Sequence, residues 1–139
     1  MLETKRKEKS ILTFPADREI ALETNNLQVY YGDNHAMQDA SLQFPRYSIT
    51  ALIGASGSGK STYLRSLNRM NDGIARVDGE IMYRGLDVNA DEVDIYQMRR
   101  RIGMVYQRPN PFAKSIYNNI SFPLREMGIK DKSKIDGIV

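Results

Sequence analysis

The 139-residue sequence predicts an α/β fold in which an antiparallel layer of short strands precedes a core strand and its helix. Residues 21–31 alternate apolar and polar side chains, which is typical of a half-buried strand. A turn at residues 32–34 and a second alternating stretch at residues 40–44, ended by a proline, indicate an antiparallel partner. Residues 49–53 are mostly apolar and β-favouring, and a glycine-rich stretch separates them from a helical pattern at residues 60–70.

Composition excludes several classes of protein. An apolar fraction of 41% and a charged fraction of 27% are ordinary for a soluble globular domain. Cysteine is absent, which excludes disulfides and thiolate metal sites and fits a reducing compartment such as the cytoplasm. No apolar run approaches the roughly 18 residues of a membrane-spanning helix. Residues 1–20 begin with a charged stretch and no apolar signal segment, so we expect a basic, flexible tail there.

The glycine-rich stretch fits the phosphate-loop pattern G-x-x-x-x-G-K-[ST] without a mismatch. It consists of Gly54, Ala55, Ser56, Gly57, Ser58, Gly59, Lys60, Ser61 and Thr62. Glycine permits backbone conformations in which successive N–H groups turn toward one anion, and the following helix presents its positive end to the same place. Lys60 can reach the β- and γ-phosphates, and the Ser61 hydroxyl can ligate Mg²⁺. A Gly/Ser linker is the alternative, but the strand before and the helix after favour a phosphate-binding loop.

The expected first helix, residues 60–70, places four apolar side chains on one face, as a helix that packs against a sheet does. These side chains are Tyr63, Leu64, Leu67 and Met70. The Asn-Asp-Gly sequence at residues 71–73 should end this helix. A further short strand is expected at residues 79–84, and Gly85 should turn the chain after it.

The last third of the sequence predicts a helix at residues 94–101 and a buried strand at residues 102–106. Two prolines in the loop at residues 108–112 hold that loop extended, and Ser115 is a suitable N-cap for the helix that follows. The arginines at residues 99–101 could suggest nucleic acid. At a helix end they more readily cap carbonyl groups and face water, so we expect no nucleic-acid partner.

Residues 21–128 resemble the ATP-binding subunits of ABC transporters in four features that occur in the family's order. Tyr31 stands where the family places an aromatic side chain that stacks on adenine; taken without the phosphate loop, it would be interpreted as a core aromatic. The phosphate loop follows. Gln107 comes after the expected buried strand, like the family's Q-loop glutamine, which helps to hold Mg²⁺ and the attacking water. Residues 108–119 correspond to the segment that approaches the membrane-spanning partner.

Four stretches are similar to the phosphate-importer branch of this family: residues 68–72, 75–81, 100–112 and 115–120. The resemblance implies a P-loop NTPase, with a RecA-like core, in which residues 21–139 form the N-terminal portion of the ATP-binding domain. It further implies ATP and Mg²⁺ as cofactors, membrane-spanning permease subunits and a second ATP-binding subunit as partners, and a peripheral position on the cytoplasmic side of the membrane. The cargo rests on resemblance alone, because such a subunit does not bind it.

Two motifs that the family requires are missing from the sequence. There is no Leu-Ser-Gly-Gly-Gln signature, and no apolar run ending in the aspartate and catalytic glutamate of a Walker B motif. We therefore expect the N-terminal part of a longer ATPase, truncated before the helical subdomain and second half and inactive by itself. The residues leave three alternatives: an ABC ATPase for another cargo such as amino acids, a non-transport ABC-type nucleotide-binding module, and a small-molecule P-loop kinase.

Overall fold

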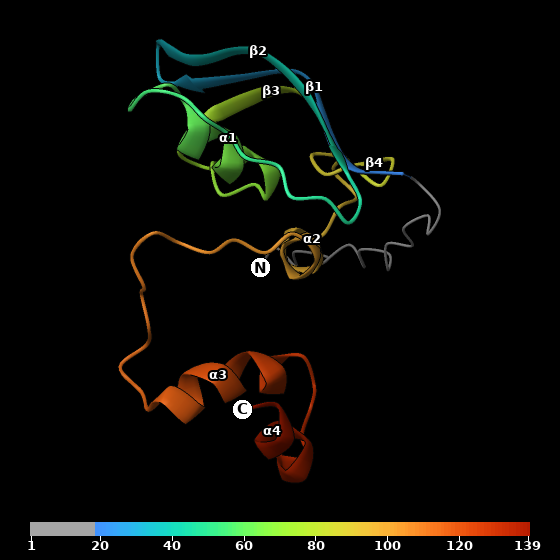
Figure 1. Ribbon diagram of the computed structural model, residues 1–139, viewed down its shortest axis with the longest axis vertical. Helices are drawn as coiled ribbons and strands as arrows, with labels where there is room; N and C mark the ends of the chain where they lie inside the picture. The colour runs from blue at the N-terminus through green and yellow to red at the C-terminus, as the bar shows by residue number, and fades with distance from the viewer. Residues whose placement is uncertain (1–18) are drawn as a thin grey trace, which may run out of the picture. The chain divides into compact units, whose positions relative to one another are not determined.

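The computed structural model describes residues 19–139 and divides into two units, the first ending at Met104 and the second spanning Val105–Val139. The expected tail at residues 1–20 lies almost wholly outside the described residues. The first unit contains β1 (Ile20–Tyr31), β2 (Asn34–Pro45), α1 (Lys60–Leu67), β3 (Arg76–Tyr83), β4 (Leu86–Asp87) and α2 (Ile95–Arg101) (Figure 1). The second unit contains α3 (Ile116–Glu126) and α4 (Lys132–Ile138).

An antiparallel sheet with the strand order β2-β1-β3-β4 forms the first unit, which confirms the expected antiparallel layer. β1 and β2 form a hairpin in which Tyr31 pairs with Asn34 and Leu22 with Phe44. β2 therefore begins six residues before the expected stretch at residues 40–44, because its pairing with β1 continues up to the turn, and it ends at Pro45 as expected. β3 and β4 are joined by the expected turn at Gly85.

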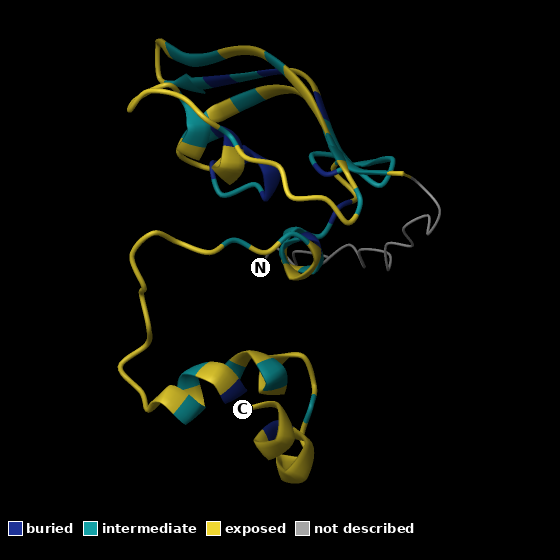
Figure 2. Cartoon of the chain, in the orientation of Figure 1, coloured by how far each residue is buried: buried dark blue, intermediate teal, exposed yellow. Residues whose placement is uncertain are grey.

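The core of the first unit lies between this sheet and the helices (Figure 2). Its buried members come from both layers: Leu27, Tyr63, Leu67, Ile81, Val88, Val93 and Met98. Tyr63 joins the layers directly, because its hydroxyl lies 2.9 Å from Thr24 Oγ1 on β1 and its ring centroid lies 6.2 Å from that of Phe44 on β2. This contact fixes α1 on the face of the sheet.

Helix α1 is shorter than the sequence pattern predicts. It ends at Leu67, so Met70 lies in the turn beyond it, and Leu64 is 45% exposed instead of packing against the sheet. Arg99 on α2 holds the turn beyond this end, because its guanidinium donates hydrogen bonds to the carbonyl oxygens of Asn68 and Arg69 at 3.1 and 2.7 Å. The sequence predicts that the arginines cap the end of their own helix, whereas Arg99 bonds to carbonyl groups of the turn after α1.

Neither of the two expected buried strands forms. Residues 49–53 and 102–106 take no strand conformation, and Ile49, Ile53 and Val105 are 102%, 95% and 98% exposed. An apolar run of this kind becomes a strand only when strands beside it accept its backbone hydrogen bonds. No strand of the described residues pairs with either segment. The prediction was wrong for this chain, although its α/β class and its antiparallel layer are correct.

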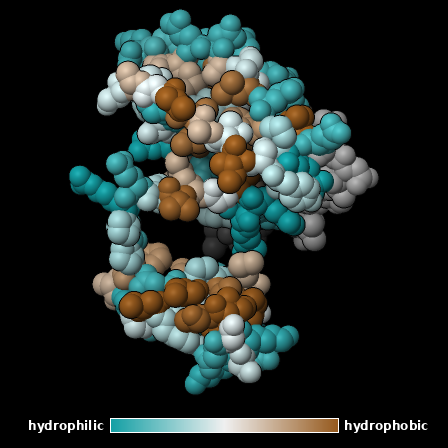
Figure 3. Space-filling model, viewed as in Figure 1, coloured by the Kyte–Doolittle hydropathy of each residue, from teal (hydrophilic) through white to brown (hydrophobic). Residues whose placement is uncertain are grey.

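The second unit is a pair of short helices. Ser115 is the N-cap of α3, where its Oγ accepts a hydrogen bond from the N–H of Asn118, as expected. The Asn119 side chain closes the preceding loop by bonding to the backbone of Phe112, Lys114 and Ser115. Figure 3 shows apolar side chains gathered over this unit, where Ile116 and Met127 are largely exposed. Within residues 19–139, no helix has the length and hydrophobicity needed to cross a membrane.

Candidate phosphate-binding site

The glycine-rich loop leads directly into α1, as the sequence predicts. Gly59 is the N-cap residue of this helix, with φ of 89°, and Gly57 has φ of 80°. Both angles lie in the left-handed region, where a side chain is strained, so the loop needs glycine at these two positions. The five residues before Gly59 are exposed to solvent. The loop is thus an open turn at the positive end of a helix.

Several backbone donors of this loop have no partner among the described residues. No hydrogen bond from the N–H of Gly57, Gly59, Lys60 or Ser61 occurs there, and α1 has no side-chain cap. The first N–H groups of a helix lack an intrahelical acceptor, so they are free to bind an anion. Ser58 N–H alone turns inward, to the carbonyl oxygen of Ala55 at 3.3 Å.

The Lys60 side chain folds back into the loop. Its Nζ donates hydrogen bonds to the carbonyl oxygens of Gly54 and Ala55, each at 2.7 Å, and to Ser58 Oγ at 3.2 Å. The ammonium group is therefore held among polar atoms of the loop that an anionic ligand would approach. Neutral carbonyl oxygens bind an ammonium less strongly than phosphate oxygens do, so Lys60 can exchange them for a bound phosphate.

A hollow of about 440 Å³ lies between this loop and strand β2. Ala36 and Met37 of β2 form one wall, and a Cβ atom on Gly59 would lie 3.4 Å from Met37 Cε and 3.7 Å from the Ala36 carbonyl oxygen. The opposite wall includes Lys60 and Tyr63. The sequence does not indicate that Ala36 or Met37 lines a site, because both residues simply follow a predicted hairpin turn.

Tyr31 stands at the end of β1 and is partly buried. Its hydroxyl donates a long hydrogen bond of 3.4 Å to Oδ1 of Asn71, a fully buried side chain after α1. Asn71 in turn donates to the carbonyl oxygen of Thr62, the last residue of the phosphate loop. Tyr31 is therefore linked to the helix that carries Lys60 and Ser61. Stacking of its ring on a base stays a prediction.

Gln107 is exposed and belongs to the second unit, in the loop before α3. The phosphate loop and Ser61 belong to the first unit, so the pairing of Gln107 with Ser61 is not tested by the described structure. No cluster of three or more acidic or histidine side chains suited to a metal ion occurs within residues 19–139. A shared Mg²⁺ site of Ser61 and Gln107 stays a prediction.

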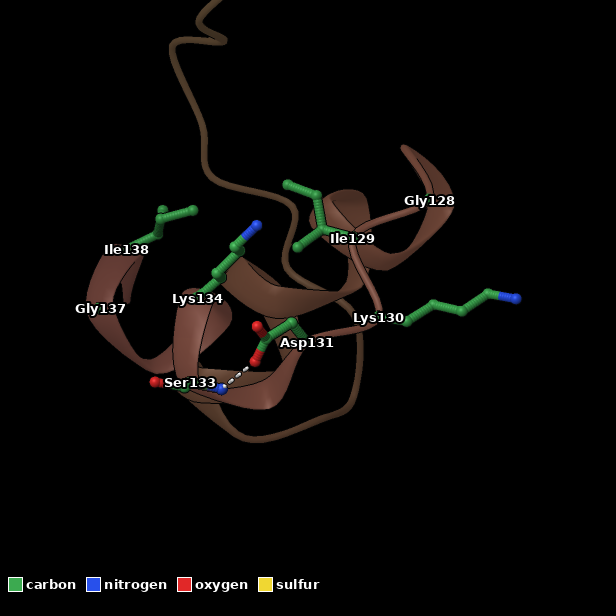
Figure 4. Close-up of a pocket in the computed structure, with 8 residues that line it drawn as sticks. All are labelled: Gly128, Ile129, Lys130, Asp131, Ser133, Lys134, Gly137 and Ile138. Carbon is green, nitrogen blue, oxygen red and sulfur yellow. Dashed lines mark hydrogen bonds between the residues drawn. The ribbon is translucent and has the colours of Figure 1, made fainter.

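A second hollow, of about 630 Å³, lies in the second unit between Gly128 and Ile138 (Figure 4). Two lysines line it, but Lys130 points away from its centre in this view. The Asp131 carboxylate accepts from the N–H of Ser133 and serves as the N-cap of α4. None of the residues that the sequence marks as functional lines this hollow, so we assign it no chemistry.

Two titrating side chains have shifted pKa values. Burial raises the pKa of the Tyr63 phenol above its ordinary value of 10.0, an effect that the hydrogen bond with Thr24 partly offsets. In the second unit, a hydrogen bond to Asp136 raises the pKa of the partly buried Tyr117 phenol. Both phenols are therefore neutral near pH 7 and contribute no charge there.

A glycine-rich loop at the start of a helix, with an inward lysine and backbone donors that have no partner in the described residues, is typical of a phosphate-loop protein. The family model of ABC transporters matches residues 37–138, and the chain belongs to this family. The fold class is accordingly that of the P-loop NTPases, with the antiparallel layer formed by β1 to β4.

Curated relatives cover most of the chain. The phosphate import ATP-binding protein PstB 1 of Latilactobacillus sakei subsp. sakei (strain 23K) is 72% identical over 123 residues, which are 87% of this chain and 46% of that protein. A protein with the same name from Lactiplantibacillus plantarum is 62% identical over 133 residues, which are 95% of this chain and 49% of that protein. The phosphate import ATP-binding protein PstB 2 of Enterococcus faecalis is 66% identical over 122 residues, 86% and 45% of the two chains. The chain thus spans about half the length of the curated relatives that it matches.

Proposed function

We propose that this protein binds ATP and Mg²⁺ through residues 54–62 and belongs to the ATP-hydrolysing subunit of an importer for inorganic phosphate. The observation that carries the proposal is the phosphate loop, where the N–H groups of Gly57, Gly59, Lys60 and Ser61 have no partner in the described residues. The names of the relatives, which are phosphate import ATP-binding proteins, support the choice of cargo.

The residues present fit a nucleotide polyphosphate. A Cβ atom on Gly54 would lie 2.8 Å from Ser58 Oγ, so glycine leaves space where the loop folds around the Lys60 ammonium. The loop N–H groups would bind phosphate oxygens, and Lys60 would neutralise part of their charge. Ser61 and Gln107 would ligate Mg²⁺, which neutralises charge on the β- and γ-phosphates when bound. Gln107 would also orient the attacking water, and Tyr31 would stack on adenine.

The second unit supplies the surface for a membrane partner. Residues 108–119, which include the proline loop and the start of α3, would contact the permease subunits. The exposed side chains of Phe112 and Ile116 suit such a contact, since exposed apolar groups gather at interaction surfaces. The protein would then sit peripherally on the cytoplasmic side of the membrane. A second ATP-binding subunit would complete the hydrolytic site, so we expect little hydrolysis by the 139-residue chain alone.

Phosphate uptake by cells tests the cargo. We expect that replacing Lys60 by alanine in the chromosomal gene strongly reduces uptake of radiolabelled phosphate by phosphate-starved cells. Uptake of a labelled amino acid, measured in the same cells, should not change. Loss of amino-acid uptake with normal phosphate uptake would assign the subunit to another importer. Normal uptake of both would contradict a role in importing either.

A further inference from the structure

We propose that Asn71 is a positioning residue for nucleotide binding, which holds Tyr31 at a fixed place relative to α1 and the phosphate loop. This proposal rests on the nucleotide-binding function proposed above and deepens it. The sequence pattern gives Asn71 only the role of ending a helix. In the structure, its side chain lies between the two parts of the proposed site.

The Asn71 side chain is fully buried, and all of its polar atoms have partners. Its Nδ2 donates to the carbonyl oxygen of Thr62 at 3.0 Å and to Ser66 Oγ at 2.7 Å. Because a carbonyl oxygen can only accept, the Thr62 contact fixes which end of the amide is the nitrogen. Oδ1 is therefore turned toward the Tyr31 hydroxyl, from which it accepts the 3.4 Å hydrogen bond.

The backbone of Asn71 is anchored as well. Its carbonyl oxygen accepts from the N–H groups of Ile74 at 3.1 Å and Ala75 at 2.9 Å. Ser66 strengthens this network, because its hydroxyl donates a hydrogen bond to the same Thr62 carbonyl oxygen at 3.0 Å. A buried amide that is held at both ends has one orientation, because a rotated amide would leave buried polar groups without partners.

The two ends of this network are the two places that one ATP molecule must contact together. Thr62 lies in the first turn of α1, beside Lys60 and Ser61, so its carbonyl moves with the phosphate loop. Tyr31 is the last residue of β1, on a different element. The reach of a nucleotide from its phosphates to its base is limited, so a misplaced ring weakens stacking on the base while the phosphates remain bound.

Binding of two ligands separates this role from a purely structural one. ATP would use both the loop and Tyr31, whereas inorganic tripolyphosphate can use only the loop. We expect Asn71→Ala to lower ATP affinity about two- to fivefold, a modest effect that suits one long hydrogen bond. Tripolyphosphate affinity should stay within about twofold of the unchanged chain. Isothermal titration calorimetry with each ligand, in the presence of Mg²⁺, measures both.

Asn68→Ala is the matched control, since Asn68 is also a buried asparagine of the same turn, 4% exposed. Its Oδ1 has no hydrogen-bond partner within residues 19–139 and so does not bond to Tyr31. It should affect both ligands equally. An equal loss of both ligands in Asn71→Ala, or no loss of either, would overturn the proposal. If instead the unchanged chain binds tripolyphosphate and ATP equally and Tyr31→Ala has no effect, the base-stacking part of the proposed function fails.

A second variant decides the matter if Asn71→Ala does not fold. Tyr31→Phe keeps the stacking ring and the amide's bonds to α1, and removes only the hydroxyl that meets Oδ1. We expect it to lower ATP affinity about twofold without changing tripolyphosphate affinity. If Asn71→Ala folds, it should add less to the loss in the Tyr31→Phe background than it causes alone. Unchanged ATP affinity in Tyr31→Phe would contradict the proposal.

Discussion

Single side chains of this protein are placed by hydrogen bonds that connect elements far apart in the sequence. The Tyr31 hydroxyl reaches Asn71, and Thr24 on β1 reaches both Tyr63 on α1 and the Ala40 carbonyl oxygen on β2. Such contacts are not encoded by local patterns, because a buried polar residue and a surface one look alike in a sequence. The phosphate-loop residues were predictable, since their motif is contiguous. Asn71 was not, since its burial depends on the whole first unit.

Replacing Tyr31 tests its proposed role in base stacking. We expect Tyr31→Ala to lower ATP affinity by about 1–3 kcal/mol, the range for an aromatic ring stacked on a base, without unfolding the chain. Tyr30→Ala is the matched control, because the Tyr30 ring stacks instead on His35, with a centroid distance of 4.1 Å, and lies under Arg76. Fluorescence titration and thermal melting measure the two effects. A lower melting temperature with unchanged ATP affinity in Tyr31→Ala would assign Tyr31 to the core.

The raised pKa of Tyr63 predicts a loss of stability at alkaline pH. Burial favours the neutral phenol, so the folded state keeps its proton above pH 10.0, where the unfolded chain releases it. This contribution is fully present below pH 10.0 and is lost as the pH rises through the folded-state pKa. Between pH 9 and 11.5 the melting temperature should therefore fall more steeply for the unchanged chain than for Tyr63→Phe. Parallel curves would show that Tyr63 titrates alike in both states.

Among helices and strands, the elements that depend on local sequence signals were predicted correctly, and the strands that depend on a neighbouring strand were not. β1, β2, α2 and α3 follow alternation, turn residues and caps, and all four form near their expected positions. The segments at residues 49–53 and 102–106 have strand-like composition but no strand beside them in the described residues. Composition specifies that a segment can be a strand, but its hydrogen bonds must come from neighbouring strands.

Strand β3 contains a glycine that its pairing requires. Gly79 has φ of 92°, and a Cβ atom there would lie 2.3 Å from the Asn26 carbonyl oxygen, at a bulge in β1. We expect Gly79→Ala to cost about 2–4 kcal/mol of unfolding free energy, from backbone strain together with overpacking. Gly73→Ala should cost only about 1–2 kcal/mol, because Gly73 shares the positive φ but has open space around it. Urea denaturation measures the unfolding free energy of both variants. Equal losses in Gly79→Ala and Gly73→Ala would exclude the close contact with Asn26 as the cause.

At the scale of the whole molecule, the exposed apolar segments bear on how the chain behaves in solution. Ile49 and Ile53 lie fully exposed on a stretch of backbone that pairs with no strand of the described residues, which is a ready template for association. We expect the 139-residue chain to self-associate as its concentration rises, and the double variant Ile49→Ser, Ile53→Ser to do so less. Leu64→Ser changes a half-exposed apolar side chain on α1 and should change little. Sedimentation velocity measures this, and a chain that stays monomeric at every concentration would refute the expectation.

We infer that the phosphate loop binds ATP through Lys60. Isothermal titration of the chain with ATP and Mg²⁺, compared with Lys60→Ala, tests it most directly. Lys60→Ala removes an ammonium held at the loop, so we expect ATP binding to weaken by about 1.5–3 kcal/mol. Arg65→Ala, which removes a positive charge from the last turn of the same helix, should leave binding nearly unchanged. Equal ATP affinity in the unchanged chain and in Lys60→Ala would contradict the assignment of the phosphate loop as the nucleotide site.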